Sequence, residues 1–249
     1  MAINALDALE PSGGLARSRR SRERRFYSGL AIIMAVCVFI GFAPSYYMKA
    51  HYGVPPALTP MLHFHGAVFT SWIVLLVVQT QLVANNRIQL HRWLGVGGAI
   101  LAGLMVILAA VVPITRFQSG LMGGVPGAPP APVLLSVALS TVVVFPILIG
   151  SALYYRNRPD YHKRLMIIAT AELMSAAFGR FPVVGGNPLT FFAATDLIVV
   201  ALLVHDVFTI RRVHPATLWG GLFLILSQPA RLLIPGTAAW LTFVAWLKP

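Results

Sequence analysis

The chain has 249 residues, of which 57% are hydrophobic and only 10% are charged, and its mean hydropathy is +0.78. These values lie outside the range of soluble globular proteins, so we expect a protein whose solvent is lipid. The formal net charge of +12 is spread over segments that flank apolar runs, which favours contact with anionic lipid and argues against a nucleic-acid partner.

The first 25 residues are basic and contain Ser and Gly, and we predict a disordered cytoplasmic tail at 1–25. The remainder, 26–249, is predicted to be one transmembrane helical domain, because about 20 apolar residues suffice to span a bilayer. Seven such runs occur, at 26–48, 61–84, 93–115, 132–155, 164–181, 189–210 and 216–233. A shorter stretch, 236–247, carries Trp240 and Trp246 and predicts a C-terminal interfacial helix. The predicted fold is therefore all-α and polytopic, with seven transmembrane helices.

Basic residues gather in alternate loops, as expected where short loops rich in Lys and Arg stay in the cytoplasm. Six arginines precede the first run, and later cytoplasmic loops hold Arg87, Arg92, Arg156, Arg158, Lys163, Arg164, Arg211 and Arg212. The opposite loops carry few cations, among them Lys49, Arg116 and Lys248. We therefore predict a multi-pass protein of the cell inner membrane, with its N-terminus in the cytoplasm and its C-terminus outside.

One phrase occurs twice, each time between two apolar runs. It consists of Asn86-Arg87, three residues, His91, a basic residue and Leu94, and again of Asn157-Arg158, three residues, His162, a basic residue and Leu165. The repetition indicates a helical hairpin used twice, with a histidine at the same depth in each copy.

Three histidines, His91, His162 and His205, are predicted at similar depth near the cytoplasmic side. Two imidazoles from different helices can hold a b-type haem, and neighbouring cations can pair with its propionates. Those cations would be Arg92, Lys163 and Arg164. A quinone would need only one imidazole and a polar partner, such as Gln79, Gln81 or Asp206. The alternative is that each histidine caps a loop or bonds to a backbone carbonyl.

The single cysteine, Cys37, lies within the first apolar run. One thiol can build neither a disulfide framework nor a thiolate metal site within the chain. Covalent c-type haem attachment is excluded because there is no C-x-x-C-H sequence.

Charged residues within the predicted spans point to a second polar region, on the outer side. Each such charge costs about 2.5 to 3.5 kcal/mol on insertion scales, so we expect these side chains to face inward and to pair. We expect Asp196 to pair with Arg231 or Arg180. The predicted outer pocket comprises His63, His65, Glu172, Arg180, Asp196, Gln228 and Arg231. These residues form either a binding pocket or a structural clasp between helices.

Four segments carry a family resemblance: Leu62-His63-Phe64-His65-Gly66, Leu90-His91-Arg92-Trp93-Leu94-Gly95, His162-Lys163-Arg164-Leu165-Met166 and His214 to Gly221. Over nearly the whole chain after the tail, this sequence resembles a group of small multi-pass bacterial inner-membrane proteins, which implies the fold but no particular activity. The pattern His-Arg-x-x-Gly at a helix start is similar to one in haem-binding membrane proteins such as cytochrome b561 and haem A synthase. That similarity implies haem b, although this chain lacks two outer histidines on different helices.

Three classes of function follow from the sequence. The first is a redox protein that binds haem b or quinone, and the second is a small-molecule transporter or receptor with the outer polar pocket. The third is an accessory subunit that binds another membrane protein or a second copy of itself. Whether the protein is an enzyme is left undecided, since no Gly-rich phosphate loop, nucleophile elbow or H-E-x-x-H motif is present.

Overall fold

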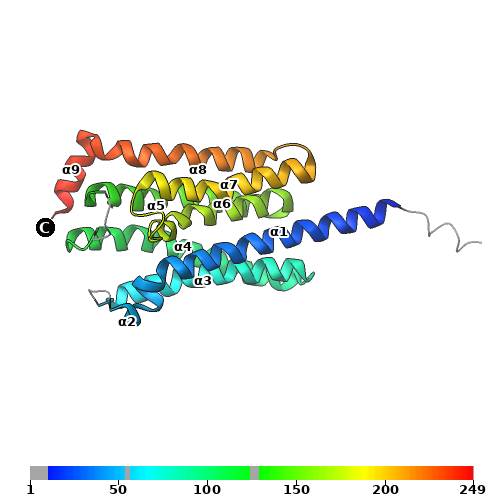
Figure 1. Ribbon diagram of the computed structural model, residues 1–249, viewed down its shortest axis with the longest axis horizontal. Helices are drawn as coiled ribbons and strands as arrows, with labels where there is room; N and C mark the ends of the chain where they lie inside the picture. The colour runs from blue at the N-terminus through cyan, green and yellow to red at the C-terminus, as the bar shows by residue number, and fades with distance from the viewer. Residues whose placement is uncertain (1–10, 54–56, 124–128, 249) are drawn as a thin grey trace, which may run out of the picture.

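A computed structural model describes residues 11–53, 57–123 and 129–248. These residues form helices joined by short connections, and no strand occurs among them (Figure 1). The helices are α1 (Pro11–Phe42), α2 (Lys49–Tyr52), α3 (Pro60–Ala84), α4 (Ile88–Gln118), α5 (Ala131–Tyr154), α6 (Pro159–Phe178), α7 (Pro188–Ile210), α8 (Pro215–Leu233) and α9 (Ala238–Leu247), with the short turns η1 (Ala43–Tyr47), η2 (Tyr155–Asn157) and η3 (Ile234–Gly236). The all-α fold predicted from the sequence is confirmed.

Six helical segments are long and apolar enough to cross a membrane, which makes this a multi-pass membrane protein. They are Ser21–Tyr47, Pro60–Ala84, Ile88–Gln118, Ala131–Asn157, Pro188–Ile210 and Pro215–Gly236. The sequence predicted a seventh span at 164–181, but α6 is not apolar enough to be counted with these six. Four charged residues, Asp160, Lys163, Arg164 and Glu172, lower its hydropathy. The predicted short C-terminal helix is present as α9.

Helix α6 is the best-buried helix of the bundle, which explains how it carries these charges. It packs against α1, α5, α7 and α8, and Figure 1 shows it among the other long helices. Its inward side chains include the fully buried Ile168, Ala169 and Ala171 as well as the charged Arg164 and Glu172. Neighbouring helices thus take the place of lipid around α6, so its polar groups can be satisfied by protein.

Helix starts follow local signals in the sequence. The span predicted at 61–84 is observed as Pro60–Ala84, with the Thr59 hydroxyl accepting from the Leu62 N–H at 3.3 Å. Likewise the side chain of Asn187 accepts from the Leu189 N–H at 3.0 Å at the start of α7. Proline in the first turn and a capping oxygen before it are both typical of helix N-termini.

Helix α1 extends beyond the span expected to begin at Phe26. It starts at Pro11, so residues 11–25 of the predicted disordered tail belong to a helix, while residues 1–10 lie outside the described part of the chain. The segment is rich in Arg, with Ala, Leu and Glu, all good helix formers that continue the helix of the apolar run.

Two glycines allow helices to approach closely. A Cβ atom on Gly41 of α1 would lie 2.5 Å from the backbone oxygen of Ala177 in α6. In α8, a Cβ on Gly221 would lie 2.6 Å from Cγ1 of Val199 in α7. The backbones of α1 and α6 therefore approach closely because Gly41 has no side chain.

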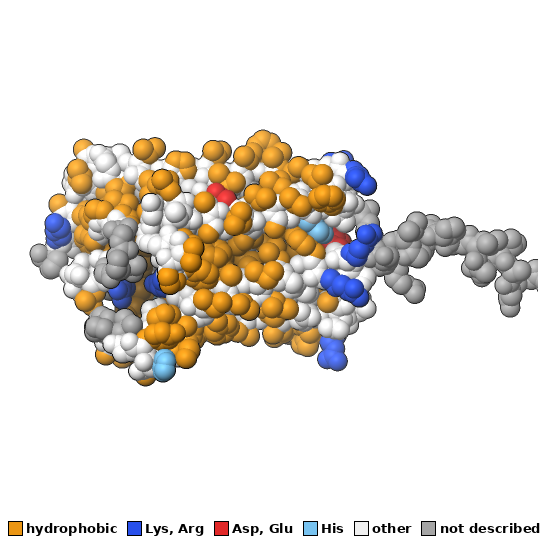
Figure 2. Space-filling view, in the orientation of Figure 1, with side chains coloured by type: hydrophobic (Ala, Val, Ile, Leu, Met, Phe, Trp, Pro, Cys, Tyr) orange, Lys and Arg blue, Asp and Glu red, His pale blue; other side chains and the backbone are white. Residues whose placement is uncertain are grey.

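The bundle has two chemically different ends. The basic end is the one where α1 begins, and its Lys and Arg side chains are visible on that side of Figure 2. Between the ends, Figure 2 shows a broad hydrophobic surface. Exposed apolar side chains of the long helices include Ile100, Phe208 and Leu226, at 72%, 77% and 67%. Large apolar side chains this exposed require lipid as their surroundings.

Candidate cofactor site and buried ion pairs

The two histidines of the repeated phrase meet at the basic end. His91 lies in the first turn of α4 and His162 in the first turn of α6. Their ring centroids are 6.2 Å apart, and the ring planes are inclined by 83°. The two copies of the repeat therefore bring equivalent imidazoles together.

Hydrogen bonds position the rings and their surroundings. Nδ1 of His162 lies 2.8 Å from the carbonyl oxygen of Ala152, so the second ring nitrogen, Nε2, is the one available to a ligand. The Gln79 side-chain N–H donates to the backbone oxygen of His91 at 3.1 Å. Within the described residues, Nδ1 of His91 and Oε1 of Gln79 are buried and have no hydrogen-bond partner.

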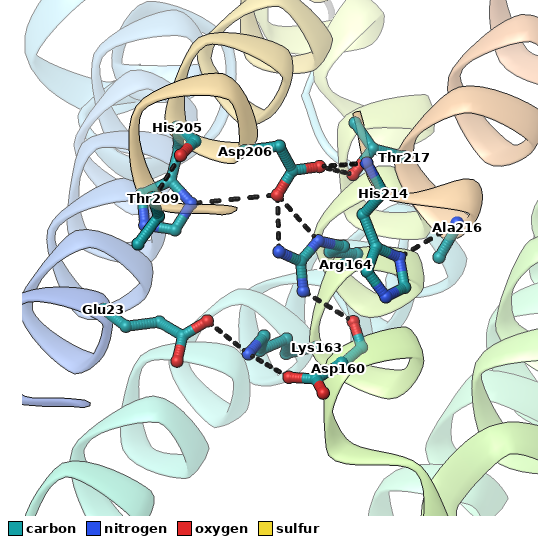
Figure 3. Close-up of polar contacts among 10 residues, drawn as sticks. All are labelled: Glu23, Asp160, Lys163, Arg164, His205, Asp206, Thr209, His214, Ala216 and Thr217. Carbon is teal, nitrogen blue, oxygen red and sulfur yellow. Dashed lines mark hydrogen bonds and ion pairs between the residues drawn. The ribbon is translucent and has the colours of Figure 1, made fainter. Parts of the chain in front are cut away.

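His205 and His214 have different surroundings from that pair. The His205 ring stacks on Phe26, with centroids 3.9 Å apart, and its Nδ1 is 4.0 Å from Oδ1 of Asp206. His214 caps α8, since its Nδ1 accepts from the Ala216 N–H at 3.1 Å (Figure 3). The structure thus pairs His91 with His162, and the described contacts of His205 involve neither of them.

A buried ion pair between Arg164 and Asp206 joins α6 to α7 (Figure 3). Nε and Nη2 of Arg164 donate to Oδ1 of Asp206 at 2.9 and 2.5 Å, and the two side chains are 2% and 0% exposed. Oδ2 of Asp206 accepts from the Thr217 hydroxyl at 2.6 Å and from the His214 backbone N–H at 3.2 Å. This network ties α8 to the same carboxylate.

Two of the three cations predicted to pair with haem propionates are bonded to carboxylates of the protein instead. Arg164 is bonded to Asp206, and Lys163 bonds to Glu23 and Asp160 at 2.5 and 2.9 Å. Arg92, next to His91, is exposed. The sequence shows that Asp206 lies near the end of its span. That it pairs with Arg164 depends on how α6 and α7 are rotated about their axes, which the sequence does not reveal.

A second buried ion pair lies deeper in the bundle, and it corrects an expectation. Arg231 was expected to pair with Asp196, but its Nη2 donates to Oε2 of Glu172 at 2.7 Å, with side chains 2% and 0% exposed. Thr141 donates to the other Glu172 oxygen at 3.1 Å, and Arg231 also donates to Ser227 at 2.7 Å. The rotation of α8 about its axis turns Arg231 toward Glu172. The ion pair therefore links α6 to α8, and the bond from Thr141 links α6 to α5.

The remaining residues of the predicted outer pocket are more dispersed. Oδ1 of Asp196 accepts from the Gln228 amide at 2.7 Å. His63 is exposed, whereas His65 is partly buried and stacks on Phe69. The Arg180 guanidinium lies 4.2 Å from the centre of the Phe42 ring. Glu172 and Arg231 pair with each other, but the buried Nε of Arg231 has no hydrogen-bond partner among the described residues.

Comparison with protein-family models, curated proteins and solved structures found no significant match. In the described part of the chain, no group of three or more His, Cys, Asp or Glu side chains is arranged to hold a metal ion. Two imidazoles from different helices are a donor set that would suit haem iron.

Proposed function

We propose that this protein is a membrane redox protein that holds a b-type haem between His91 and His162. The observation that carries the proposal is the meeting of these two rings, whose centroids are 6.2 Å apart. Two metal–imidazole bonds of about 2.0 to 2.1 Å place the centres of the two ligand rings roughly 6 Å apart. The separation therefore fits one metal atom between the rings.

The surroundings of the two rings support a ligand role. The Ala152 carbonyl fixes the His162 ring through Nδ1, as backbone carbonyls often do for metal-bound imidazoles, and leaves Nε2 for iron. His91 has a buried nitrogen that no described group satisfies, and a bound group would relieve its cost.

Haem, when bound, supplies one-electron transfer. His91 and His162 would hold the iron, and a neighbouring cation would pair with the propionates. Of the predicted propionate partners, Arg92 has no carboxylate contact in the described residues, whereas Lys163 and Arg164 do. We therefore assign the propionate contact to Arg92.

Quinone is the second candidate, and a separate observation favours it. Oε1 of Gln79 is also buried without a hydrogen-bond partner, and Gln79 bonds to the backbone of His91. A quinol hydroxyl could donate to either of these unpaired acceptors. Both candidates place the cofactor at His91.

The test is the absorption spectrum of protein purified from its own membranes, together with solvent extraction of bound quinone. We expect a Soret band in wild-type protein and its loss when His91 and His162 are both replaced by Ala. His205→Ala is the matched control and should keep the band, because that ring stacks on Phe26 instead. A Soret band that survives the double substitution, or protein with neither haem nor quinone, would refute the proposal.

We also propose that the basic end faces the cytoplasm, so that the N-terminus is inside and the C-terminus outside the inner membrane. The concentration of Lys and Arg at that end supports this orientation. A reporter that is active only outside the cytoplasm, fused after Lys248, should be active, and an inactive C-terminal fusion that is stably expressed would reverse the assignment.

A further inference from the structure

A groove lies on the side of the bundle where α5, α6 and α8 pack against one another. Its volume is about 240 Å³, and its walls include Ile147 of α5, Tyr161 of α6, and Trp219 and Phe223 of α8. Most of the side chains that line it are apolar or aromatic. Because Ile147 and Trp219 are 47% and 68% exposed, the groove opens sideways, toward the lipid that surrounds the long apolar helices.

The groove is long and apolar enough to hold part of an acyl chain. From Ile147 to Tyr155 its α5 wall is roughly 12 Å long, at about 1.5 Å of rise per residue. Ser151 lies between these two residues, and its hydroxyl donates to the Ile147 carbonyl at 2.7 Å. A hydrocarbon chain along this wall would therefore leave the Ser151 hydroxyl with its hydrogen bond.

Aromatic side chains mark the end of the groove that lies nearest the basic end of the bundle. Tyr155 and Tyr161 both line the groove and stack on each other, with ring centroids 4.8 Å apart. The Tyr161 ring also meets the His214 ring, at 4.6 Å between centroids. Tyrosine is enriched where the hydrocarbon of a bilayer meets its headgroups. The groove therefore begins near headgroup depth and runs toward the middle of the membrane.

Two arginines lie beside this aromatic end. Cζ of Arg158 is 6.0 Å from the centre of the Tyr155 ring, and Arg156 directly follows Tyr155 in the chain. Both arginines are exposed, and neither has a carboxylate partner in the described part of the chain. Asp160, the acid nearest to them in sequence, bonds to Lys163 at 2.9 Å. The end of the groove thus carries positive charge that no described acid neutralises.

We propose that this groove binds an acyl chain of an anionic phospholipid whose phosphate is held by Arg156 and Arg158. Guanidinium groups present paired N–H donors that match the oxygens of a phosphate. A headgroup with a net negative charge suits two unpaired cations better than a zwitterionic headgroup does. A free phosphate compound would lack the chain that fills the groove.

This lipid site is separate from the proposed cofactor site. No described residue that lines the groove belongs to α4, the helix that carries His91. Either proposal can therefore fail without the other.

The experiment is native mass spectrometry of the purified full-length protein in neutral detergent, which resolves individual bound lipids. Phosphatidylglycerol and phosphatidylcholine with identical chains are titrated separately, and we expect wild-type protein to bind phosphatidylglycerol more tightly. Arg156→Gln and Arg158→Gln should each weaken phosphatidylglycerol binding about tenfold, the scale of one charge-assisted hydrogen bond. Arg87→Gln is the matched control, because it removes the same charge from an exposed residue just before α4, and it should leave binding unchanged.

Filling the groove tests its apolar part. Ser151→Phe adds a ring to the groove wall and should weaken phosphatidylglycerol binding. Ile100→Phe is the control, since it adds a ring at a position of α4 that is 72% exposed, and it should not weaken binding. Should Ser151→Phe fail to fold, as judged by circular dichroism, Ile147→Trp fills the groove from a more exposed position and should have the same effect.

Three results would overturn the proposal. The first is equal binding of both lipids by wild-type protein, which would assign the groove to a neutral apolar ligand if Ser151→Phe abolished that binding. The second is phosphatidylglycerol binding by the Arg156 and Arg158 variants that is as tight as binding by Arg87→Gln. The third is a folded groove-filling variant that binds as tightly as Ile100→Phe.

Discussion

Replacing Arg231 with Met should be among the most destabilising single changes in this protein. The substitution leaves the Glu172 carboxylate, whose side chain is 0% exposed, without a cation in the bundle interior. Breaking a buried ion pair by removing one partner costs about 3 to 5 kcal/mol. At 1.36 kcal/mol for each factor of ten, the unfolding equilibrium should shift by roughly two to nearly four orders of magnitude.

Removing both charges should restore most of that loss. In the double variant Glu172→Gln with Arg231→Met, no charge is buried at this position, and the amide oxygen can still accept from Thr141, which now donates to Glu172 at 3.1 Å. Unfolding in mixed micelles of a neutral detergent and dodecyl sulfate, followed by circular dichroism, measures each free energy of unfolding.

Asp196→Asn is the internal control, because Asn keeps an oxygen that accepts from Gln228. We expect a change of no more than about 1 kcal/mol, the scale of one ordinary hydrogen bond. The assignment of Glu172 as the partner of Arg231 fails if Asp196→Asn is as costly as Arg231→Met, or if the double variant is no more stable than the single one.

Two further substitutions test packing and capping. Gly41→Ala should destabilise the fold, because its Cβ would lie 2.5 Å from the Ala177 backbone oxygen, whereas Gly97→Ala, with nothing within 4 Å, should change the unfolding free energy little; equal effects would contradict the close approach. His214→Ala should cost about 1 kcal/mol by removing the cap on Ala216, and His214→Asn should retain it. Burial, and then the charge of Arg164, lower the pKa of His214 below its ordinary value of 6.5. The stability that the neutral His214 cap contributes should therefore be present above pH 6.5 and be lost as the pH falls below it. Denaturation curves at several pH values should show a weaker pH dependence in His214→Asn than in wild type, and an unchanged pH dependence would refute this role.

The helices could be predicted closely because their signals are local. Proline and a capping side chain mark the start of α7, predicted at residue 189 and observed at Pro188. The repeated phrase likewise predicted His91 and His162 at one depth, and the centroids of the two rings lie 6.2 Å apart. Spacing along a helix is enough for such predictions, because the depth of a residue in the membrane follows from its position along the spanning helix.

Partner choice could not be predicted in the same way. Asp196 and Glu172 both lie within their spans, and the sequence does not reveal which one faces Arg231, because this depends on the rotation of three helices. The same holds for Arg164, expected to face a cofactor but bonded to Asp206. A charged residue within a span predicts that a partner exists, whereas the packing of neighbouring helices determines which residue that partner is.

The polarity of α6 has a consequence for biogenesis. A segment with four charged residues is poorly recognised by the insertion machinery, which sorts nascent segments by apolarity. Helix α5 precedes it and packs against it, so the two would enter the bilayer as a hairpin. Glu172 of α6 finds Arg231 only once α8 has been synthesised, so until then its carboxylate lacks the cation that pairs with it in the folded bundle.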